Sequence, residues 1–333
     1  MRYLFFVNNH ISHLTAKGII KHLELKIDDC TFLTERNYEI ENPLGKTLEF
    51  PFSHLPDSFR VALGPIRLRQ KIKSLDSFIN TISDHQPFEI FVTQTSITYF
   101  YLIHSNPNCK GFSLIEGGLG CYNLEYLKMV SHKAFWLRRL LYRLLYRNRV
   151  PELKYFFNID FPKFKNCYGT NDKAFKGFKN QIVLDNPFTN DTRYKGINNV
   201  LVLDAIREFN YISSDAVKFV LTFLLEKLKN DIEQLHFKFH PEHYRRPEDM
   251  AFYKNIFAPY QKHFTIIELD KHTVLENLIH SSDANFYVFV SSIGMYADMM
   301  GKKVFSLAKK LTERENTFKF QYESYHKGSI QYL

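Results

Sequence analysis

The chain has 333 residues, of which 45% are hydrophobic and 16% aromatic, and it carries a net charge of +9 at pH 7. This composition excludes a disordered protein and is sufficient for a large buried core, and the length favours two domains over one. The positive charge favours an anionic partner, such as a phosphate-bearing donor, lipid head groups, an acidic glycan or nucleic acid, without choosing among them.

The first predicted element is the apolar run from Tyr3 to Val7, which stops at Asn8 and Asn9. It is too short for a signal-peptide core or a membrane span and has the length of a buried strand. No later run approaches the roughly 18 apolar residues of a spanning helix. We therefore expect a cytoplasmic protein that does not cross the bilayer by itself, although it could lie on the inner membrane.

Further short apolar runs alternate with segments of helical periodicity. The predicted strands after the first are 88–92, 111–115, 200–203, 235–239, 263–269 and 285–290, and a helix is predicted over 213–229. This alternation predicts an α/β protein with parallel sheets covered by helices.

A polar stretch with a proline, 185–191, indicates a domain boundary. We expect an N-terminal Rossmann-like domain, 1–190, and a C-terminal one, 191–333, with a final helix that could pack back on the first. Ligands of open parallel sheets gather at the carboxyl ends of the strands, so a cleft between the domains is the expected site.

The first candidate motif follows the strand 111–115 and consists of Glu116, Gly117 and Gly118. A carboxylate at a strand end can act as a general base, and glycines allow close approach of the backbone to a ligand. A solvated glutamate beside an ordinary glycine turn is the alternative.

The second motif closes the strand 235–239. Lys238 and His240 share one face of that strand, and Pro241 prevents its extension. Two hydrogen-bond donors then point together, although any one-sided edge strand with basic residues gives the same pattern.

The third motif, Ser291 and Ser292, lies between the strand 285–290 and a predicted helix. Two hydroxyls and free N–H groups at a helix N-terminus suit a phosphate, and simple capping by serine is the alternative. Glu276 lies just upstream and could bind the two hydroxyls of a ribose, or belong to a surface helix.

Neither metal-binding nor cofactor-binding patterns occur. The four cysteines, Cys30, Cys109, Cys121 and Cys167, have neither zinc-site spacing nor the density of a disulfide framework and indicate reduced thiols. His243 is an isolated histidine, there is no Asp-x-Asp triplet, and no nucleotide-binding glycine fingerprint is present. We expect a metal-free mechanism and no cofactor other than an activated sugar substrate.

In this order, the three motifs resemble those of the bacterial GT-B sialyltransferases, which include lipooligosaccharide sialyltransferases and capsular polysialyltransferases. Those enzymes show an acidic-acidic-Gly motif, a Lys-x-His-Pro motif and a Ser-Ser or Ser-Thr motif. Ile115 replaces the first acidic residue here, whereas Glu116 keeps the position that the family uses as base.

The resemblance implies two Rossmann-like domains and an inverting transfer of sialic acid from CMP-sialic acid to a surface glycan. Glu116 would be the base, while His240, Ser291 and Ser292 would bind the phosphate. By the same resemblance, Lys238 would face the cytidine and Glu276 the ribose. The donor could instead carry Kdo, pseudaminic or legionaminic acid. Further loop residues complete the predicted site: Asn8, Asn9, Gly117, Gly118 and Pro241 on the donor side, and Thr95 on the acceptor side.

The segment 134–149 predicts an amphipathic helix with Arg139, Arg143 and Arg147 in one stripe. Such a helix suits anionic lipids and hence a lipid-linked acceptor, and a core-packing helix with a solvated basic face is the alternative. A non-catalytic basic protein that binds a membrane or polyanion is the rival class. We expect no nucleic-acid partner, because the stacked aromatic platform of an RNA module is absent.

Overall fold

The computed structural model describes residues 1–35, 38–40, 43–52, 65–95, 97–122, 157, 159–316 and 330–333, together with Leu140 and Leu144. The chain forms two compact units, Met1–Pro187 and Phe188–Leu333, each of which has its own sheet and core. The roles predicted for the halves 1–190 and 191–333 stay predictions.

The described part of the N-terminal unit holds a seven-stranded parallel sheet in the order β3-β2-β1-β4-β5-β6-β7. Its strands are β1 (Arg2–Val7), β2 (Cys30–Thr34), β3 (Lys46–Glu49), β4 (Phe88–Val92), β5 (Cys109–Ile115), β6 (Phe164–Gly169) and β7 (Gln181–Val183). Its helices are α1 (His10–His22), α2 (Pro65–Ile82) and α3 (Thr98–His104), with the short 3-10 helices η1 (Ile27–Asp29) and η3 (Leu119–Tyr122).

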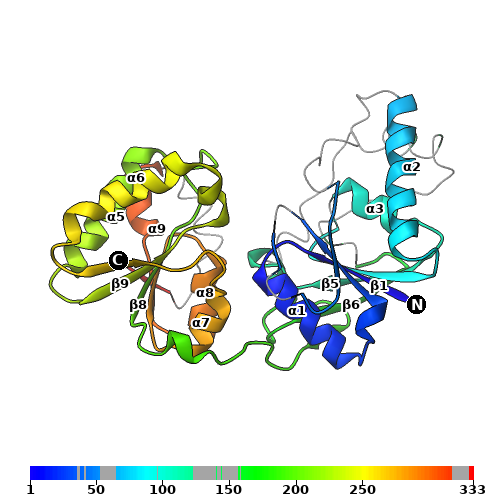
Figure 1. The fold of residues 1–333 in the computed structure, drawn as a ribbon, viewed down its shortest axis with the longest axis horizontal. Coiled ribbons are helices and arrows are strands. Elements are labelled where there is room, and N and C mark those ends of the chain that lie inside the picture. The colour runs from blue at the N-terminus through cyan, green and yellow to red at the C-terminus, as the bar shows by residue number, and fades with distance from the viewer. Residues whose placement is uncertain are drawn as a thin grey trace. The chain divides into compact units, whose positions relative to one another are not determined.

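Both faces of this sheet are covered, because successive side chains of a strand point to opposite sides. On β1, Leu4 and Phe6 join a core with α2 and α3, whereas Phe5 and Val7 join a second core with α1. Figure 1 shows α1 on one side of the sheet and α2 with α3 on the other. Burial on both faces explains why β1 is a continuous apolar run.

The C-terminal unit holds a parallel sheet in which six strands are described, in the order β10-β9-β8-β11-β12-β13. Its strands are β8 (Asn199–Val202), β9 (Gln234–Lys238), β10 (Thr265–Glu268), β11 (Asn285–Val288), β12 (Val304–Ser306) and β13 (Gln331–Tyr332). Its helices are α5 (Ser214–Leu228), α6 (Pro247–Phe257), α7 (Leu275–Ser281), α8 (Ser292–Met299) and α9 (Ala308–Thr312), with the 3-10 helices η5 (Thr192–Tyr194), η6 (Pro241–Arg245) and η7 (Ala258–Tyr260).

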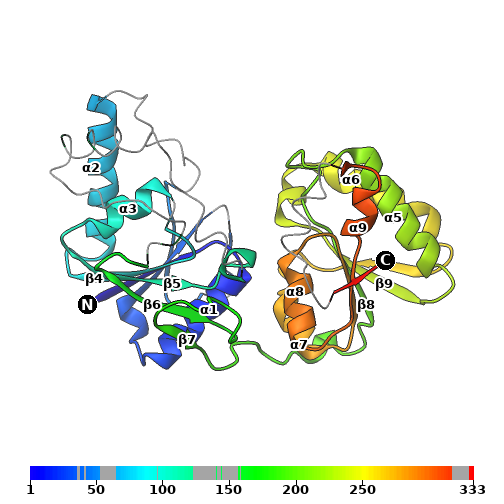
Figure 2. The same ribbon diagram turned by 180° about the vertical axis from the view of Figure 1, so that it is seen from behind.

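Helix α5 shows how sequence builds this unit. The side chain of Ser213 accepts a hydrogen bond from the N–H of Ala216 and caps the helix. Leucines and valines at helical spacing, including Val217, Leu221 and Leu224, are buried against the sheet together with α6 and α9. Figure 2 shows α7 and α8 together on the other face.

The seven strands and the helix predicted from sequence are confirmed within two residues at every end. The largest differences, of two residues, are at the start of β5, the start of β10 and the end of β11. Strands β2, β3, β6, β7, β12 and β13 were not predicted. The final helix stays a prediction, because residues 317–329 lie outside the described part, and residues 331–332 form β13.

The strand order has the same form in both units. The first strand lies in the interior, the next two extend the sheet to one side, and the fourth begins the other side. This is the doubly wound order 3-2-1-4-5-6, in which ligands bind where the winding reverses. The reversal lies between β1 and β4 in the first unit and between β8 and β11 in the second.

Two further findings bear on the sequence predictions. All four cysteines are buried and none forms a disulfide. None of the helices that the structure describes is long and apolar enough to cross a membrane.

Because Leu224 is fully buried in α5, Leu224→Ala leaves a cavity and lowers the free energy of unfolding by about 2–5 kcal/mol. Lys218→Ala, on the exposed face of the same helix, changes it by less than about 0.5 kcal/mol. Urea titrations followed by circular dichroism measure both. Equal midpoints for the two variants would contradict the packing described here.

Candidate functional site

Asp204 joins the loops that follow β8 and β11 in the C-terminal unit. Its Oδ2 accepts a hydrogen bond of 2.8 Å from the N–H of Val290. Burial raises the pKa of this carboxyl to about 6, even though the N–H bond lowers it. Asp204 therefore fixes the backbone at the winding reversal, where a ligand of this fold is expected.

The N-terminus of α8 begins directly after this contact. The hydroxyl of Ser291 accepts a hydrogen bond of 3.3 Å from the N–H of Ile293 and so caps the helix. The N–H and hydroxyl of Ser292 have no hydrogen-bond partner among the described residues. Gly294 packs close to β11, since a Cβ there would lie 2.8 Å from Val288 Cγ2. The helix thus presents free donors and its positive dipole end to an anion.

His240 lies two residues past the end of β9 and caps the 3-10 helix η6, which starts at Pro241. Its ring atom Nδ1 accepts a hydrogen bond of 3.1 Å from the backbone N–H of Glu242. The backbone N–H of His240 donates to Nδ1 of His243 at 3.2 Å. Because Nδ1 is the acceptor in both rings, each neutral ring carries its proton on Nε2. His240 Nε2 has no partner among the described residues and is available to donate.

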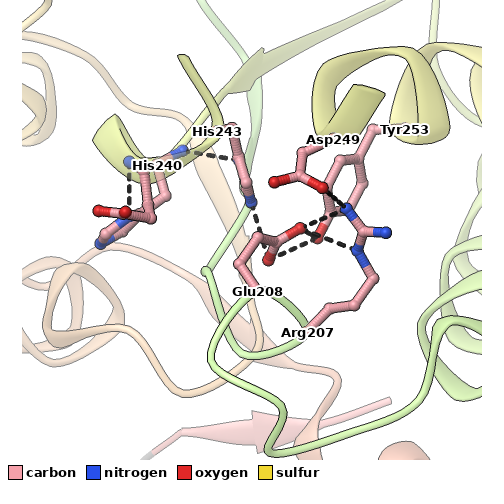
Figure 3. Close-up of polar contacts among 7 residues, drawn as sticks. Arg207, Glu208, His240, His243, Asp249 and Tyr253 are labelled. Carbon is pink, nitrogen blue, oxygen red and sulfur yellow. Dashed lines mark hydrogen bonds and ion pairs between the residues drawn. The ribbon is translucent and has the colours of Figure 1, made fainter. Parts of the chain in front are cut away.

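A buried network of charged side chains supports His243 and, through it, the backbone of His240. Nε2 of His243 lies 3.1 Å from Oε2 of Glu208, and both side chains are at most 1% exposed. Arg207 contacts the carboxylates of Glu208 at 2.7 Å and Asp249 at 2.6 Å. Figure 3 shows the resulting chain of contacts, which runs from Asp249 through Arg207, Glu208 and His243 to His240.

These surroundings determine the protonation of the two key groups. Burial raises the pKa of Glu208, but hydrogen bonds from His243 and Arg207 bring it down to about 2. Burial, and then the neighbouring His243, lower the pKa of His240 to about 4. Glu208 is therefore a carboxylate, and His240 a neutral hydrogen-bond donor, at physiological pH.

The side chain of Lys238 points into the C-terminal unit and away from solvent. Its side chain is 6% exposed, and Nζ donates to the carbonyl oxygens of Asp270 at 2.8 Å and Lys271 at 2.5 Å. Burial lowers the pKa of this ammonium to about 8. The contacts fix the loop between β10 and α7, and the predicted contact with cytidine stays a prediction. Glu276, in the first turn of α7, is 5% exposed.

In the N-terminal unit, Glu116 follows β5 and is fully buried. Its Oε2 accepts hydrogen bonds from Thr170, at 2.7 Å from N–H and 2.9 Å from Oγ1. The hydroxyl of Tyr122 donates to Oε1 and in turn accepts from Asn171 Nδ2 at 2.6 Å. Burial, and then the adjacent Glu116, raise the pKa of Tyr122, so the phenol stays protonated.

The loops after β1, β4 and β5 meet beside Glu116. Asn9 caps α1 by accepting from Ser12 N–H at 2.9 Å, and its Nδ2 donates to the Gly117 carbonyl at 2.9 Å. Asn8 Nδ2 lies 3.4 Å from Thr93 Oγ1. Gly117 touches the same threonine, since a Cβ there would lie 2.5 Å from Thr93 Cγ2.

Two other predicted residues occupy this region. Gly118 has a φ of +116°, a conformation that favours glycine. Thr95 is fully buried, so its predicted contact with an acceptor stays a prediction and requires the loop to open.

The structure therefore places the predicted residues in two groups, one in each unit. Asn8, Asn9, Glu116, Gly117 and Gly118 gather at the carboxyl edge of the first sheet, and Lys238, His240, Pro241, Ser291 and Ser292 at that of the second. Since β8 separates β9 from β11, His240 and Ser291 are about two strand spacings, roughly 10 Å, apart along the sheet.

The predicted basic helix 134–149, with Arg139, Arg143 and Arg147, lies outside the described residues except for Leu140 and Leu144, which are exposed. Within the described part of the chain, no three His, Cys, Asp or Glu side chains form a group that could hold a metal ion.

Several residues that hold the site were not predicted from sequence, namely Tyr122, Thr170, Asp204, Arg207, Glu208 and His243. Asp204 comes just after a predicted strand, so it is a carboxylate at a strand end, as Glu116 is. His243 repeats His240 at a spacing of three residues, which is the spacing of a capping box.

No protein-family model matches the sequence, and no curated protein matches it either. Among solved structures, UDP-GlcNAc 2-epimerase of Methanocaldococcus jannaschii is similar over 95% of this chain and 87% of that chain, with 11% identity and a TM-score of 0.52. A glycosyltransferase from Rickettsia africae is 12% identical over 92% of this chain and 78% of that chain, with a TM-score of 0.43.

The epimerase likeness and the two strand orders together define a protein of the GT-B fold, built from two Rossmann-like parallel-sheet units. At 11% identity the likeness concerns the fold alone. The predicted fold class is thereby confirmed.

The burial of His240 predicts its titration. Its folded pKa of about 4 lies below the value of about 6.5 for an unfolded histidine. As the pH falls from 6.5 toward 4, the unfolded chain binds the proton first, so the stability that His240 contributes above pH 6.5 is progressively lost.

Nuclear magnetic resonance of the imidazole nitrogens, assigned with His240→Asn, tests this expectation. We expect the Nε2-protonated tautomer and no titration above about pH 5. A midpoint near 6.5, or a proton on Nδ1, would contradict the hydrogen bonds described.

Proposed function

We propose that this protein is an inverting, metal-independent glycosyltransferase that moves a sialic-acid-like nonulosonic acid from a CMP-activated donor to a glycan acceptor. The observation that carries the proposal is the group of free donors at the carboxyl edge of the second sheet, His240 Nε2 and the Ser292 N–H and hydroxyl. The epimerase neighbour was solved with UDP-GlcNAc and UDP, so in that protein the same fold holds a sugar nucleotide.

In the proposed reaction, the acceptor hydroxyl oxygen bonds to the anomeric carbon of the donor sugar as the bond from that carbon to the CMP phosphate oxygen breaks. The electron pair of the broken bond stays on the phosphate. Hydrogen bonds from His240 and Ser292 and the α8 dipole stabilise this charge without moving a proton. Because His240 is neutral, it acts as a dipolar donor and not as an acid.

The proton of the acceptor hydroxyl passes to Glu116. Tyr122 donates to Oε1 of this carboxylate, so its phenol competes with the acceptor hydroxyl for that oxygen. Thr170 continues to hold Oε2 and keeps the carboxylate oriented. Lys238 supports the reaction indirectly by fixing the Asp270 loop, which leads to α7 and Glu276.

CMP binding tests the phosphate site. At a concentration 100-fold above its Kd, CMP stabilises the folded state by about 2.7 kcal/mol, which raises the melting temperature by roughly 5–10 °C for a domain of this size. Ser292→Ala reduces this shift. Helix α5 offers a matched control, because Ser213 and Ser214 begin it as Ser291 and Ser292 begin α8. Ser214→Ala keeps the full shift, and an equal loss in both variants would count against the phosphate site.

Turnover tests the base. With a panel of CMP-linked sugars and mass spectrometry of the products, we expect transfer of a nonulosonic acid, and the panel distinguishes sialic, pseudaminic and legionaminic acid from Kdo. Glu116→Gln lowers kcat by about 10²–10⁴-fold. Tyr122→Phe removes the hydrogen bond from the phenol to Glu116 and leaves the Glu116 carboxylate in place, so we expect this variant to retain activity.

The thermal shift with CMP shows whether each of these variants is folded. A folded Glu116→Gln enzyme as fast as the parent would refute the base, and the absence of product from every CMP-sugar would refute the transferase.

A further inference from the structure

Two aromatic side chains are exposed beside His240. Phe209 and Tyr211, on the turn after β8, are each 52% exposed. Their ring centroids lie 6.2 Å apart, and the ring of Phe209 lies 6.3 Å from that of His240 at an interplanar angle of 82°. A paired aromatic surface therefore adjoins the hydrogen-bond donor of the phosphate site.

This surface belongs to an ordered turn. The N–H of Phe209 donates to the Ala205 carbonyl at 3.0 Å, and that of Tyr211 donates to the Ile206 carbonyl at 2.9 Å. Asn210, which lies between Phe209 and Tyr211 in sequence, has a φ of +58°, a left-handed conformation that asparagine tolerates well. The turn is thus tightly closed at its base.

The same turn is anchored in the buried charge network. Glu208, one residue before Phe209, has a side chain that is 1% exposed and bound to His243 and Arg207. Burial of residue 208 fixes the backbone from which the ring of Phe209 extends. The position of this ring relative to His240 is therefore set by the contacts that also hold the backbone of His240.

We propose that Phe209 and Tyr211 form an aromatic shelf that stacks against the base of the donor nucleotide. The proposal rests on the proposed function, because a nucleotide must place a planar base within a short reach of its phosphate. A base presents a π-face to stack on an aromatic ring, whereas a phosphate needs hydrogen-bond donors, and both kinds of surface adjoin at His240. Stacking accepts every base, so the shelf contributes affinity without selecting cytosine.

Calorimetric titration of the full chain with CMP, UMP and ribose 5-phosphate tests the shelf. The double variant Phe209→Leu, Tyr211→Leu keeps apolar side chains but loses both π-faces. We expect its affinity for CMP and UMP to fall by the same factor, roughly tenfold to a hundredfold, and its affinity for ribose 5-phosphate to change less than about twofold. Phe209→Tyr and Tyr211→Phe keep the rings and the affinity. Tyr332→Leu, at a 40% exposed tyrosine on β13, is the matched control and changes neither.

The outcomes separate the shelf from the phosphate site. Unchanged CMP affinity in the double variant, or an equal loss for CMP and ribose 5-phosphate, would overturn the shelf. Parent protein that binds ribose 5-phosphate as tightly as CMP would overturn it as well and leave the phosphate site intact. Parent protein that binds none of the three ligands would overturn the proposed function together with the shelf.

Discussion

Parallel pairing of every strand that the structure describes is the constraint on which the rest of this structure depends. Because all strands of a sheet run in the same direction, the loops that follow them meet at one edge, however far apart they lie in sequence. Asp204 and Val290 are hydrogen-bonded neighbours for this reason, although 86 positions separate them. Glu116 and Thr170 meet in the same way at the edge of the first sheet. Each unit thus gathers polar groups at the carboxyl edge of its sheet.

Such an edge holds a defined shape only if its buried polar groups are paired. Glu208 is almost fully buried, its charge is balanced by Arg207, and its Oε2 lies 3.1 Å from Nε2 of His243. This pairing leaves His243 with an acceptor at Nδ1, which binds the backbone N–H of His240. The buried carboxylate of Glu208 therefore holds the backbone of His240 through His243, while the N–H of Glu242 determines which ring nitrogen His240 presents. The buried network positions His240, and His240 Nε2 would donate a hydrogen bond to the ligand.

The sequence was sufficient for the elements that are buried on both faces, because β1, β4 and α5 are apolar runs or stripes of clear period. Strand β6 was missed since Lys165 and Asn166 interrupt its pattern, and β3 is only partly buried. Strand-end position identified Glu116 and His240 as candidates. Their partners could not be predicted, because those contacts depend on the fold. Lys238 shows the same limit: its carbonyl partners lie more than thirty residues away.

The central claim is that the carboxyl edge of the second sheet binds the phosphate of a nucleotide. A crystal structure of the protein with CMP tests it most directly. The account predicts phosphate oxygens within hydrogen-bond distance of His240 Nε2 and of the Ser292 N–H and hydroxyl. A phosphate bound elsewhere on the protein, with these three donors facing only solvent, would contradict it.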